Sequence, residues 1–418
     1  MNLAHDVDAK LQAIRATSLP TSGAEANDYY TAVPDDENAA LKMAGAFALM
    51  TNYNDQRSNE VALIKFPQRK DTLTPEQLEL IAGYGTMNSN ALAKAQEAIK
   101  LPRCRYPMDL SWGAATLLPH LAKLKTMSRI AEFQSLLDTN ESSVAISTII
   151  GMASTLDTEP TIISKLVRIA MLNMAEMALE RRLNVGELNE AQLTNLEQLF
   201  AEAAKTNQMA NGLIGERASF LRYFRMSFAE IQKLSNNPSE QDRPPIPGPQ
   251  PLFSTVTGFF ERDLRFYLQA MGTNISLAST FPKNISTITN VEEQISQTSR
   301  RHYYILSALM LPALGNTIIK EANELAQVRS AQTALAVERF RLANGKPPEN
   351  LNELVPQFLS AVPMDPFDGQ PLRYHRLAKG YVIYSIGSDG EDNGGRERPA
   401  NIKSTDKTHY YITFTVER

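Results

Sequence analysis

Hydrophobic positions recur with a helical period over the first three quarters of the chain. Capping boxes at Thr74–Gln77 and Asn189–Gln192 open two such segments, because an N-cap side chain and the Gln three residues later satisfy free backbone N–H groups. Similar patterns occupy residues 111–133 and 213–234. One predicted helical face repeats apolar residues at spacings of three and four, namely Ile162, Leu166, Ile169, Ala170, Met174, Met177 and Ala178. Few alternating runs precede residue 360, so we predict a large, irregular, mainly α-helical N-terminal region.

A proline-rich stretch at residues 236–250 interrupts this pattern. It reads NNPSEQDRPPIPGPQ and is typical of an exposed loop or linker. Further helical patterns follow at residues 253–271 and 291–310, and a long one runs from about Thr317 to Ala343. We therefore predict four regions, which are an α-helical domain at 1–235, a loop or linker at 236–252, further helices packing on the helical body at 253–325, and an α+β module at 326–418.

The last ninety residues have a different pattern. A capping box at Asn350–Glu353 opens a short helix, and prolines keep the chain extended after it. Residues 372–374, 381–384 and 410–416 are rich in aromatic and β-branched side chains, as strands are. The module is therefore predicted to contain a long helix, a short helix and a three-stranded antiparallel sheet.

Together these motifs resemble the globular head of the major type II secretion pseudopilin. Leu342, Gly345 and Pro348 fill the family's Leu-x-x-Gly-x-aromatic-Pro run, Val362–Tyr374 is similar to its Leu-Pro-x-Asp-Pro-Trp-Gly-x-Pro-Tyr-x-Tyr, and Ser385–Gly395 is close to its Ser-Leu-Gly-Ala-Asp-Gly-x-x-Gly-Gly. The resemblance covers about a fifth of the chain. Pseudopilins begin with a cleaved leader and a hydrophobic helix that packs into the pilus shaft, whereas a large soluble helical region occupies that position here.

Four segments of the body resemble large planctomycete-type helical proteins that carry the same tail and have no established activity. These segments are Val33–Ala40, Cys104–Pro107, Leu117–Leu121 and Gly215–Ala218. The resemblance implies a periplasmic or envelope-associated protein. Residues 1–20 contain no apolar signal segment, so we expect either that a leader is absent from this chain or that a cytoplasmic protein re-uses the tail.

The pseudopilin resemblance also implies a calcium site. Family members bind calcium through aspartates placed shortly after the glycine pair, where this chain has Arg396-Glu397-Arg398-Pro399 instead. Hard cations take oxygen ligands from carboxylates and carbonyls on flexible loops. The alternative is a glycine-rich turn whose aspartates cap their own backbone. The predicted calcium ligands are Asp389, Asp392, Ser388, the Ile386 carbonyl and Asp406.

Composition excludes several classes of function. A formal net charge of −4 gives no basic field for nucleic acid, and a single cysteine forms no internal disulfide or multi-cysteine zinc site. The chain contains no HExxH pair, Gly-x-Ser-x-Gly elbow, phosphate loop or dinucleotide fingerprint. We therefore assign no catalytic and no cofactor-binding residue. The apolar run Tyr303–Ile319 contains a proline and a glycine, which favours a broken buried helix over a transmembrane one.

Two residue groups carry weaker hypotheses. Cys104 lies between two arginines, which would activate an exposed thiol, and His120 is the histidine nearest to it in sequence. The alternative for Cys104 is a buried, apolar cysteine. Glu216 and the arginines at 217, 222 and 225 are expected to form an ion pair that joins their helix to another.

The sequence leaves three functions open. We predict a non-catalytic cell-envelope scaffold or binding protein of unassigned ligand, with an unidentified protein or envelope partner. One alternative is a hydrolytic enzyme with a cleft in the helical body, where folding brings together acids such as Asp35 and Glu216. Another is a subunit associated with the type II secretion pseudopilus. A pocket of converging groups with shifted pKa values would favour the enzyme.

Overall fold

The computed structural model shows a mainly helical chain with one small sheet. The predicted loop at 236–252 and the predicted ligand Asp406 lie outside the residues that the structure describes. The described residues are 3–52, 55–137, 141–205, 208–226, 258–311, 314–392, 394–395 and 412–418.

Helices make up most of the described chain. The α-helices before the gap at 227–257 are α1 (Leu3–Ala16), α2 (Gly23–Tyr29), α3 (Ala39–Ala48), α4 (Asp55–Leu63), α5 (Pro75–Met87), α6 (Ser89–Ala98), α7 (Pro119–Leu137), α8 (Ser142–Ser154), α9 (Ile162–Val185), α10 (Glu190–Lys205) and α11 (Gln208–Phe220). After the gap come α14 (Phe259–Ser279), α15 (Ile285–Arg301), α16 (Ile305–Met310) and α17 (Leu314–Asn344). Short 3₁₀ segments are η1 (Leu110–Ala115), η2 (Leu221–Arg225), η4 (Leu351–Leu354) and η5 (Gly387–Asp389).

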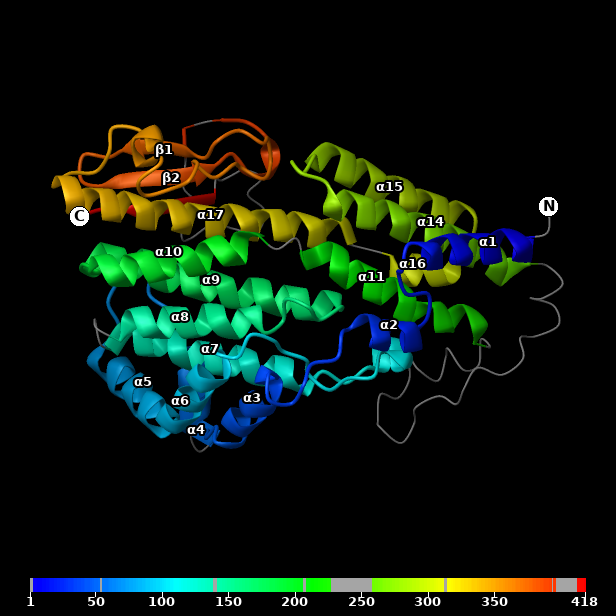
Figure 1. Cartoon of the computed structure of the whole chain (residues 1–418), viewed down its shortest axis with the longest axis horizontal. Helices are drawn as coiled ribbons and strands as arrows, with labels where there is room; N and C mark the ends of the chain where they lie inside the picture. The colour runs from blue at the N-terminus through cyan, green and yellow to red at the C-terminus, as the bar shows by residue number, and fades with distance from the viewer. Residues whose placement is uncertain are drawn as a thin grey trace.

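The long helix α17 organises the molecule (Figure 1). The sheet packs on its C-terminal part, and α14 and α15 pack along its N-terminal part. On the other side of α17 lie α10 and α9, followed by α8 and α7. Helices α17, α10, α9, α8 and α7 therefore form successive layers beneath the sheet.

Capping side chains and a proline explain where several helices begin. All three predicted capping boxes are confirmed. Thr74 pairs with Gln77 at the start of α5, Asn189 with Gln192 at the start of α10, and Asn350 with Glu353 at the start of η4. The predicted helix at 111–133 is wrong as a single element, because η1 ends at Ala115 and α7 begins only at Pro119. Proline is favoured at the first turn of a helix because its missing N–H costs nothing there. Periodicity alone does not locate such breaks.

Two helices after the gap also differ from the prediction. The pattern at 291–310 forms two helices, because α15 ends at Arg301 and α16 begins at Ile305. Tyr303 between them has a φ of 58°, a left-handed conformation that a helix cannot contain. The helix predicted at 253–271 is α14, whose described start at Phe259 follows Gly258 with a φ of 60°.

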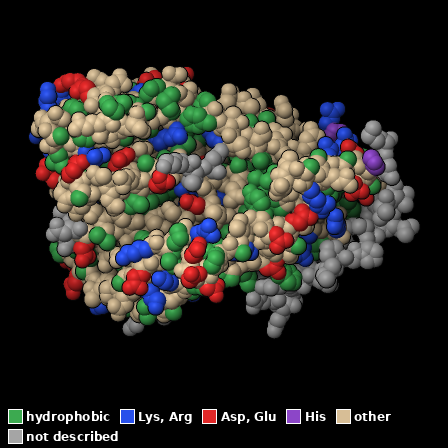
Figure 2. Space-filling model, viewed as in Figure 1, with side chains coloured by type: hydrophobic (Ala, Val, Ile, Leu, Met, Phe, Trp, Pro, Cys, Tyr) green, Lys and Arg blue, Asp and Glu red, His purple; other side chains and the backbone are tan. Residues whose placement is uncertain are grey.

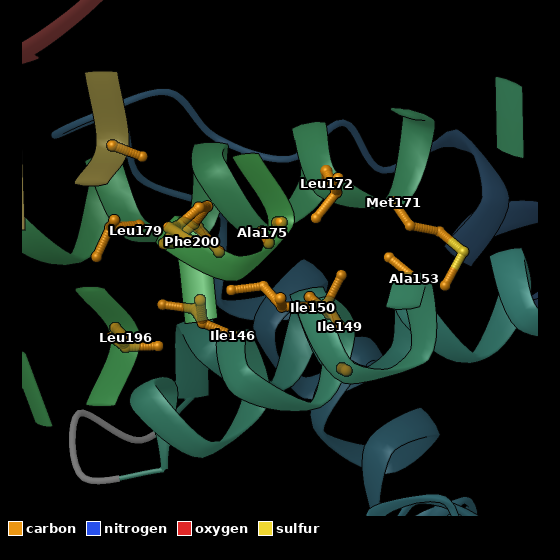
Figure 3. Packing of buried hydrophobic residues seen from close by; sticks show 14 of the residues in the cluster. Ile146, Ile149, Ile150, Ala153, Met171, Leu172, Ala175, Leu179, Leu196 and Phe200 are labelled. Atoms are coloured by element: carbon orange, nitrogen blue, oxygen red, sulfur yellow. The ribbon is translucent and has the colours of Figure 1, made fainter. Parts of the chain in front are cut away.

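The apolar core unites the helical body with the C-terminal module. One cluster of buried side chains extends from α3 to α10 and continues through the second half of α17 into the sheet. Figure 3 shows its centre, where Ile146 and Ile150 of α8 face Leu172 and Leu179 of α9 and Phe200 of α10. A second cluster joins α1, α11, α14, α16 and the first part of α17. The predicted domain boundaries stay predictions.

The sheet has the antiparallel order β1-β2-β3, which confirms a three-stranded antiparallel sheet. The strands are β1 (Arg373–Arg376), β2 (Tyr381–Ser385) and β3 (Ile412–Val416). Every residue of the central strand β2 is buried. The turn before β2 requires glycine, because Gly380 has a φ of 93° and an added Cβ would lie 1.8 Å from the Val416 carbonyl oxygen.

Side chains of α9 bond to the backbone at the outer edge of β3. The Thr415 N–H donates to Glu180 Oε1 at 2.8 Å, and Asn184 Nδ2 donates to the Thr415 carbonyl at 2.8 Å. The Glu417 N–H donates to Asn184 Oδ1 at 2.7 Å. Glu180 and Asn184 are four residues apart, so they share one face of α9. They satisfy backbone groups that an exposed sheet edge would leave unpaired, and they tie the module to the body.

The segment Ile305–Asn344 has the length and composition that a membrane-spanning helix needs, and half of its most apolar window is buried inside the protein. Core helices of globular proteins have the same composition. In the structure the segment contains α16, which ends at Met310, and α17, which begins at Leu314.

Candidate functional site

A buried carboxylate lies at the centre of the C-terminal module. Asp365 is 0% exposed. Its Oδ1 accepts from the Phe367 N–H at 3.0 Å and the Ser385 hydroxyl at 2.9 Å. Its Oδ2 accepts from the Ile386 N–H at 2.9 Å and from Arg373 Nη1 at 2.7 Å. Four donors therefore compensate the burial of this charge.

The predicted calcium loop lies beside this carboxylate. Asp392 Oδ2 is 3.7 Å from Arg373 Nε, and Asp392 Oδ1 accepts from the Tyr384 hydroxyl at 3.1 Å and the Gly394 N–H at 3.1 Å. Asp389 Oδ1 accepts from the Glu391 N–H at 3.3 Å. A guanidinium thus already faces Asp392, and both aspartates accept hydrogen bonds from nearby backbone.

The described part of this loop does not present a convergent donor set for a metal. Among the described residues, no group of three or more His, Cys, Asp or Glu side chains is arranged to hold a metal ion. Ser388 is exposed, and the Ile386 N–H is directed to the buried carboxylate of Asp365. Asp406 lies outside the described residues, so the calcium site stays a prediction.

Glu216, one of the two acids named for a hydrolase, lies at a close helix crossing. An added Cβ at Gly215 of α11 would be 1.9 Å from the Pro160 carbonyl oxygen. The Ile162 N–H at the start of α9 donates to Glu216, and burial raises the pKa of Glu216 to about 7. Asp35 is exposed before α3. Within the described structure, no hydrogen bond or ion pair joins Asp35 to Glu216.

The arginines that follow Glu216 bind backbone and aromatic groups. Arg217 Nη2 donates to the Pro20 carbonyl at 3.5 Å. Arg222 donates to the Ser111 carbonyl, and its guanidinium lies 5.6 Å from the ring centroid of Trp112. In the described chain, Arg217 of α11 and Arg222 of η2 therefore contact carbonyls and an aromatic ring, and the predicted ion pair is not formed by either arginine.

The structure places Cys104 and His120 around one buried tyrosine. The Tyr106 ring stacks on His120 with a centroid separation of 4.1 Å. His120 Nε2 lies 3.0 Å from Glu159 Oε2, a fully buried carboxylate. Burial raises the pKa of the Cys104 thiol to about 12, although a hydrogen bond with Tyr106 acts in the opposite direction. The thiol is therefore protonated at neutral pH, as a structural cysteine is.

A buried ionic cluster at the centre of the molecule was not predicted. Arg168 of α9 is 2% exposed. Its Nε lies 2.6 Å from Asp157 Oδ1, its Nη1 lies 3.1 Å from Glu324 Oε1 of α17, and its Nη2 donates to the Ala203 carbonyl at 3.1 Å. Burial raises the pKa of Glu324 to about 7 despite the guanidinium.

Lys165 and Glu321 extend this cluster towards α11. Lys165 Nζ donates to the carbonyls of Leu156 and Asp157 and to Gln208 Oε1, at 2.7 to 2.8 Å. Burial lowers the pKa of Lys165 to about 7. Glu321 Oε1 accepts from the Met209 N–H at 2.6 Å, whereas its buried Oε2 accepts no hydrogen bond from a described residue. The cluster joins α9, α11 and α17.

Two hollows lie near α4, and neither is lined by the charged groups of the cluster around Arg168. A hollow of about 730 Å³ lies between α4 and α5, and another of about 540 Å³ lies among α4, α5, α7 and α9. Lys165, Glu216 and Glu324 line neither of them. On the face drawn in Figure 2, described Lys and Arg side chains are interspersed with Asp and Glu.

Comparison with known proteins found no match among protein-family models, curated proteins or solved structures. The pseudopilin resemblance therefore stays a prediction.

Proposed function

We propose that this protein is a non-catalytic cell-envelope scaffold or binding protein whose pseudopilin-like module is fixed to its helical body. The observation that carries the proposal is the environment of α17. This helix contacts α10 and α9 on one side and the sheet on the other, and side chains along its length are buried. In a pseudopilin the corresponding part of the chain is a separate head on a shaft helix. Here helices α9 and α10 of the helical body cover α17, the helix that would correspond to the shaft helix. This favours a scaffold over a pilus subunit.

The buried ionisable groups support the same proposal. His120, Lys165 and Arg168 each contact a carboxylate or carbonyl in the protein interior, and Glu216 accepts a hydrogen bond at the start of α9. Shifted pKa values occur in structural networks as well as in active sites. These contacts favour structural roles for the four groups over a hydrolytic one.

Cell fractionation with chemical cross-linking tests the proposal. We expect the protein in the envelope fraction, cross-linked to one envelope partner, and the same cross-link in a Glu216→Gln variant. Glu97→Gln, at an exposed position of α6, is the matched control. Recovery only from the cytoplasm would contradict the envelope role. A hydrolytic activity that Glu216→Gln abolishes and Glu97→Gln retains would favour the enzyme, and cross-links to secretion subunits would favour the pseudopilus.

A further inference from the structure

The hollow of about 540 Å³ has the dimensions of a small-molecule site. Ligand pockets are commonly about 300–1,000 Å³. Four helices and the segment after α3 contribute to its wall, so residues distant in sequence converge on it. Its lining residues are Asn52, Val61, Ala62, Tyr84, Lys125, Thr126, Arg129 and Met174.

One part of the wall is apolar. Val61 of α4 is 7% exposed, and Met174 of α9 is half-buried. Methionine adapts its flexible side chain to irregular neighbours. Tyr84 contributes its ring, and its hydroxyl donates to Asn52 Oδ1 at 3.3 Å. This part of the wall suits an aliphatic chain and has a polar group at its margin.

Another part of the wall, on α7, is cationic. Lys125 and Arg129 are four residues apart on α7, so they lie on the same helical face. Arg129 is held in place, because its Nη2 donates to the Ile64 carbonyl at 2.5 Å and its guanidinium lies 4.3 Å from the Phe133 ring centroid. Arg129 also pairs with the buried carboxylate of Glu132.

The positive charge of this wall is not fully neutralised by the protein. Glu132 offsets the charge of Arg129, but none of the described residues that line the hollow is a carboxylate. Lys125 is exposed and makes no hydrogen bond or ion pair with a described residue. Like charges four residues apart on a helix repel each other. An anion between Lys125 and Arg129 would relieve that repulsion, and guanidinium N–H groups match the geometry of a carboxylate.

We propose that this hollow binds a small amphipathic carboxylate, with its aliphatic chain against Val61 and Met174 and its carboxylate at Lys125 and Arg129. The inference names a ligand class for the binding role proposed above, and so rests on that role. The ammonium of Lys125 supplies a charge that no described residue pairs, and Arg129 supplies a fixed donor.

Calorimetric titration of the full chain with decanoate, and with decanol as the uncharged probe, tests the proposal. We expect decanoate to bind at least about tenfold more tightly than decanol, which is the ratio that one charge-assisted contact gives. Lys125→Gln should weaken decanoate binding about tenfold and leave decanol unchanged. Lys123→Gln is the matched control on α7, since Lys123 does not line the hollow, and it should bind decanoate like the unmodified protein.

Filling the hollow provides a second arm. Met174→Trp should abolish decanoate binding, and Ala62→Phe serves the same purpose if the tryptophan variant does not fold. Absence of decanoate binding by the unmodified protein, equal affinity for decanol, or equal losses in Lys125→Gln and Lys123→Gln would overturn the proposal. Any of these results, combined with a cross-linked envelope partner, would overturn the ligand class and leave the scaffold role standing.

Discussion

The module and the body both bury charged groups, but they compensate them differently. In the module, Asp365 accepts four hydrogen bonds, two of them from backbone N–H groups and one from Arg373. In the body, Glu324 has Arg168 as its ion-pair partner, and Glu321 Oε2 lies 3.9 Å from Lys283 Nζ but accepts no hydrogen bond from a described residue. The difference shows that burial alone does not set the behaviour of an acid. The number and type of donors decide whether its charge is stabilised.

The largest effect is expected from Asp365→Ala in the module. The change leaves Arg373 without its most buried partner and orphans the donors at Ile386 and Ser385. Breaking a buried ion pair costs about 3–5 kcal/mol. We expect urea unfolding to show a decrease of that order in the free energy of unfolding. Asp368→Ala is the control, because Asp368 pairs with the same arginine at a partly exposed position. Equal losses for the two variants would contradict the central role of Asp365.

A smaller effect is expected from Arg168→Met in the body. Glu324 loses its guanidinium, but it takes up a proton readily because burial already raises its pKa to about 7. We therefore expect the free energy of unfolding to fall by about 2–3 kcal/mol at pH 5, which is less than the loss for an uncompensated buried charge. The loss should be greater at pH 9, where the carboxylate must ionise. Urea unfolding at both pH values measures this, and a loss independent of pH would refute the explanation.

Glu216→Gln should change the pH dependence of stability. The folded pKa of Glu216, about 7, exceeds its ordinary value of 4.5. Its contribution to stability is therefore fully present below pH 4.5 and is lost as the pH rises through about 7. Relative to the unmodified protein, the variant should be more stable at pH 8 than at pH 4.5 by about 2 kcal/mol, somewhat less than the full difference in pKa would give because the side chain is partly exposed. Parallel stability curves from denaturation at several pH values would show that Glu216 does not titrate in this window.

The smallest effect is expected from calcium at the Asp389–Asp392 loop. A weak site with Kd near 1 mM gives a rise of about 1–2 °C in the unfolding midpoint at 5 mM calcium. Thermal melting with calcium and with chelator measures the shift, and Asp389→Ala should remove it. An unchanged midpoint, together with unchanged stability of Asp389→Ala, would eliminate the site.

The sequence predicted elements better than it predicted faces. Capping boxes located the starts of α5 and α10, and the β-prone runs located the sheet. On α9, however, Leu166 and Met174 are only half-buried, while Lys165 and Arg168 are fully buried. Apolar spacing identified the helix but placed its most buried face wrongly. Arg168 can be buried on that face because Glu324 of α17 forms an ion pair with it.

The candidate sites were harder to predict for a related reason. Asp365 lies in the segment that prolines were predicted to keep extended, yet its four donors come from the strand region as well as its own turn. The hollow beside Lys125 requires the packing of α4, α5, α7 and α9. Neither arrangement has a local sequence signal, because each depends on contacts between distant segments.

The most direct test of the central claim is whether the module and the helical body unfold as one unit. Native-state hydrogen exchange in increasing urea compares amides of β2 with amides of α9. Because the two regions share a core and Glu180 and Asn184 hold β3, we predict that both sets exchange with the same free energy of opening. Exchange of the β2 amides at a lower free energy than the α9 amides would show an independent head and would contradict the account.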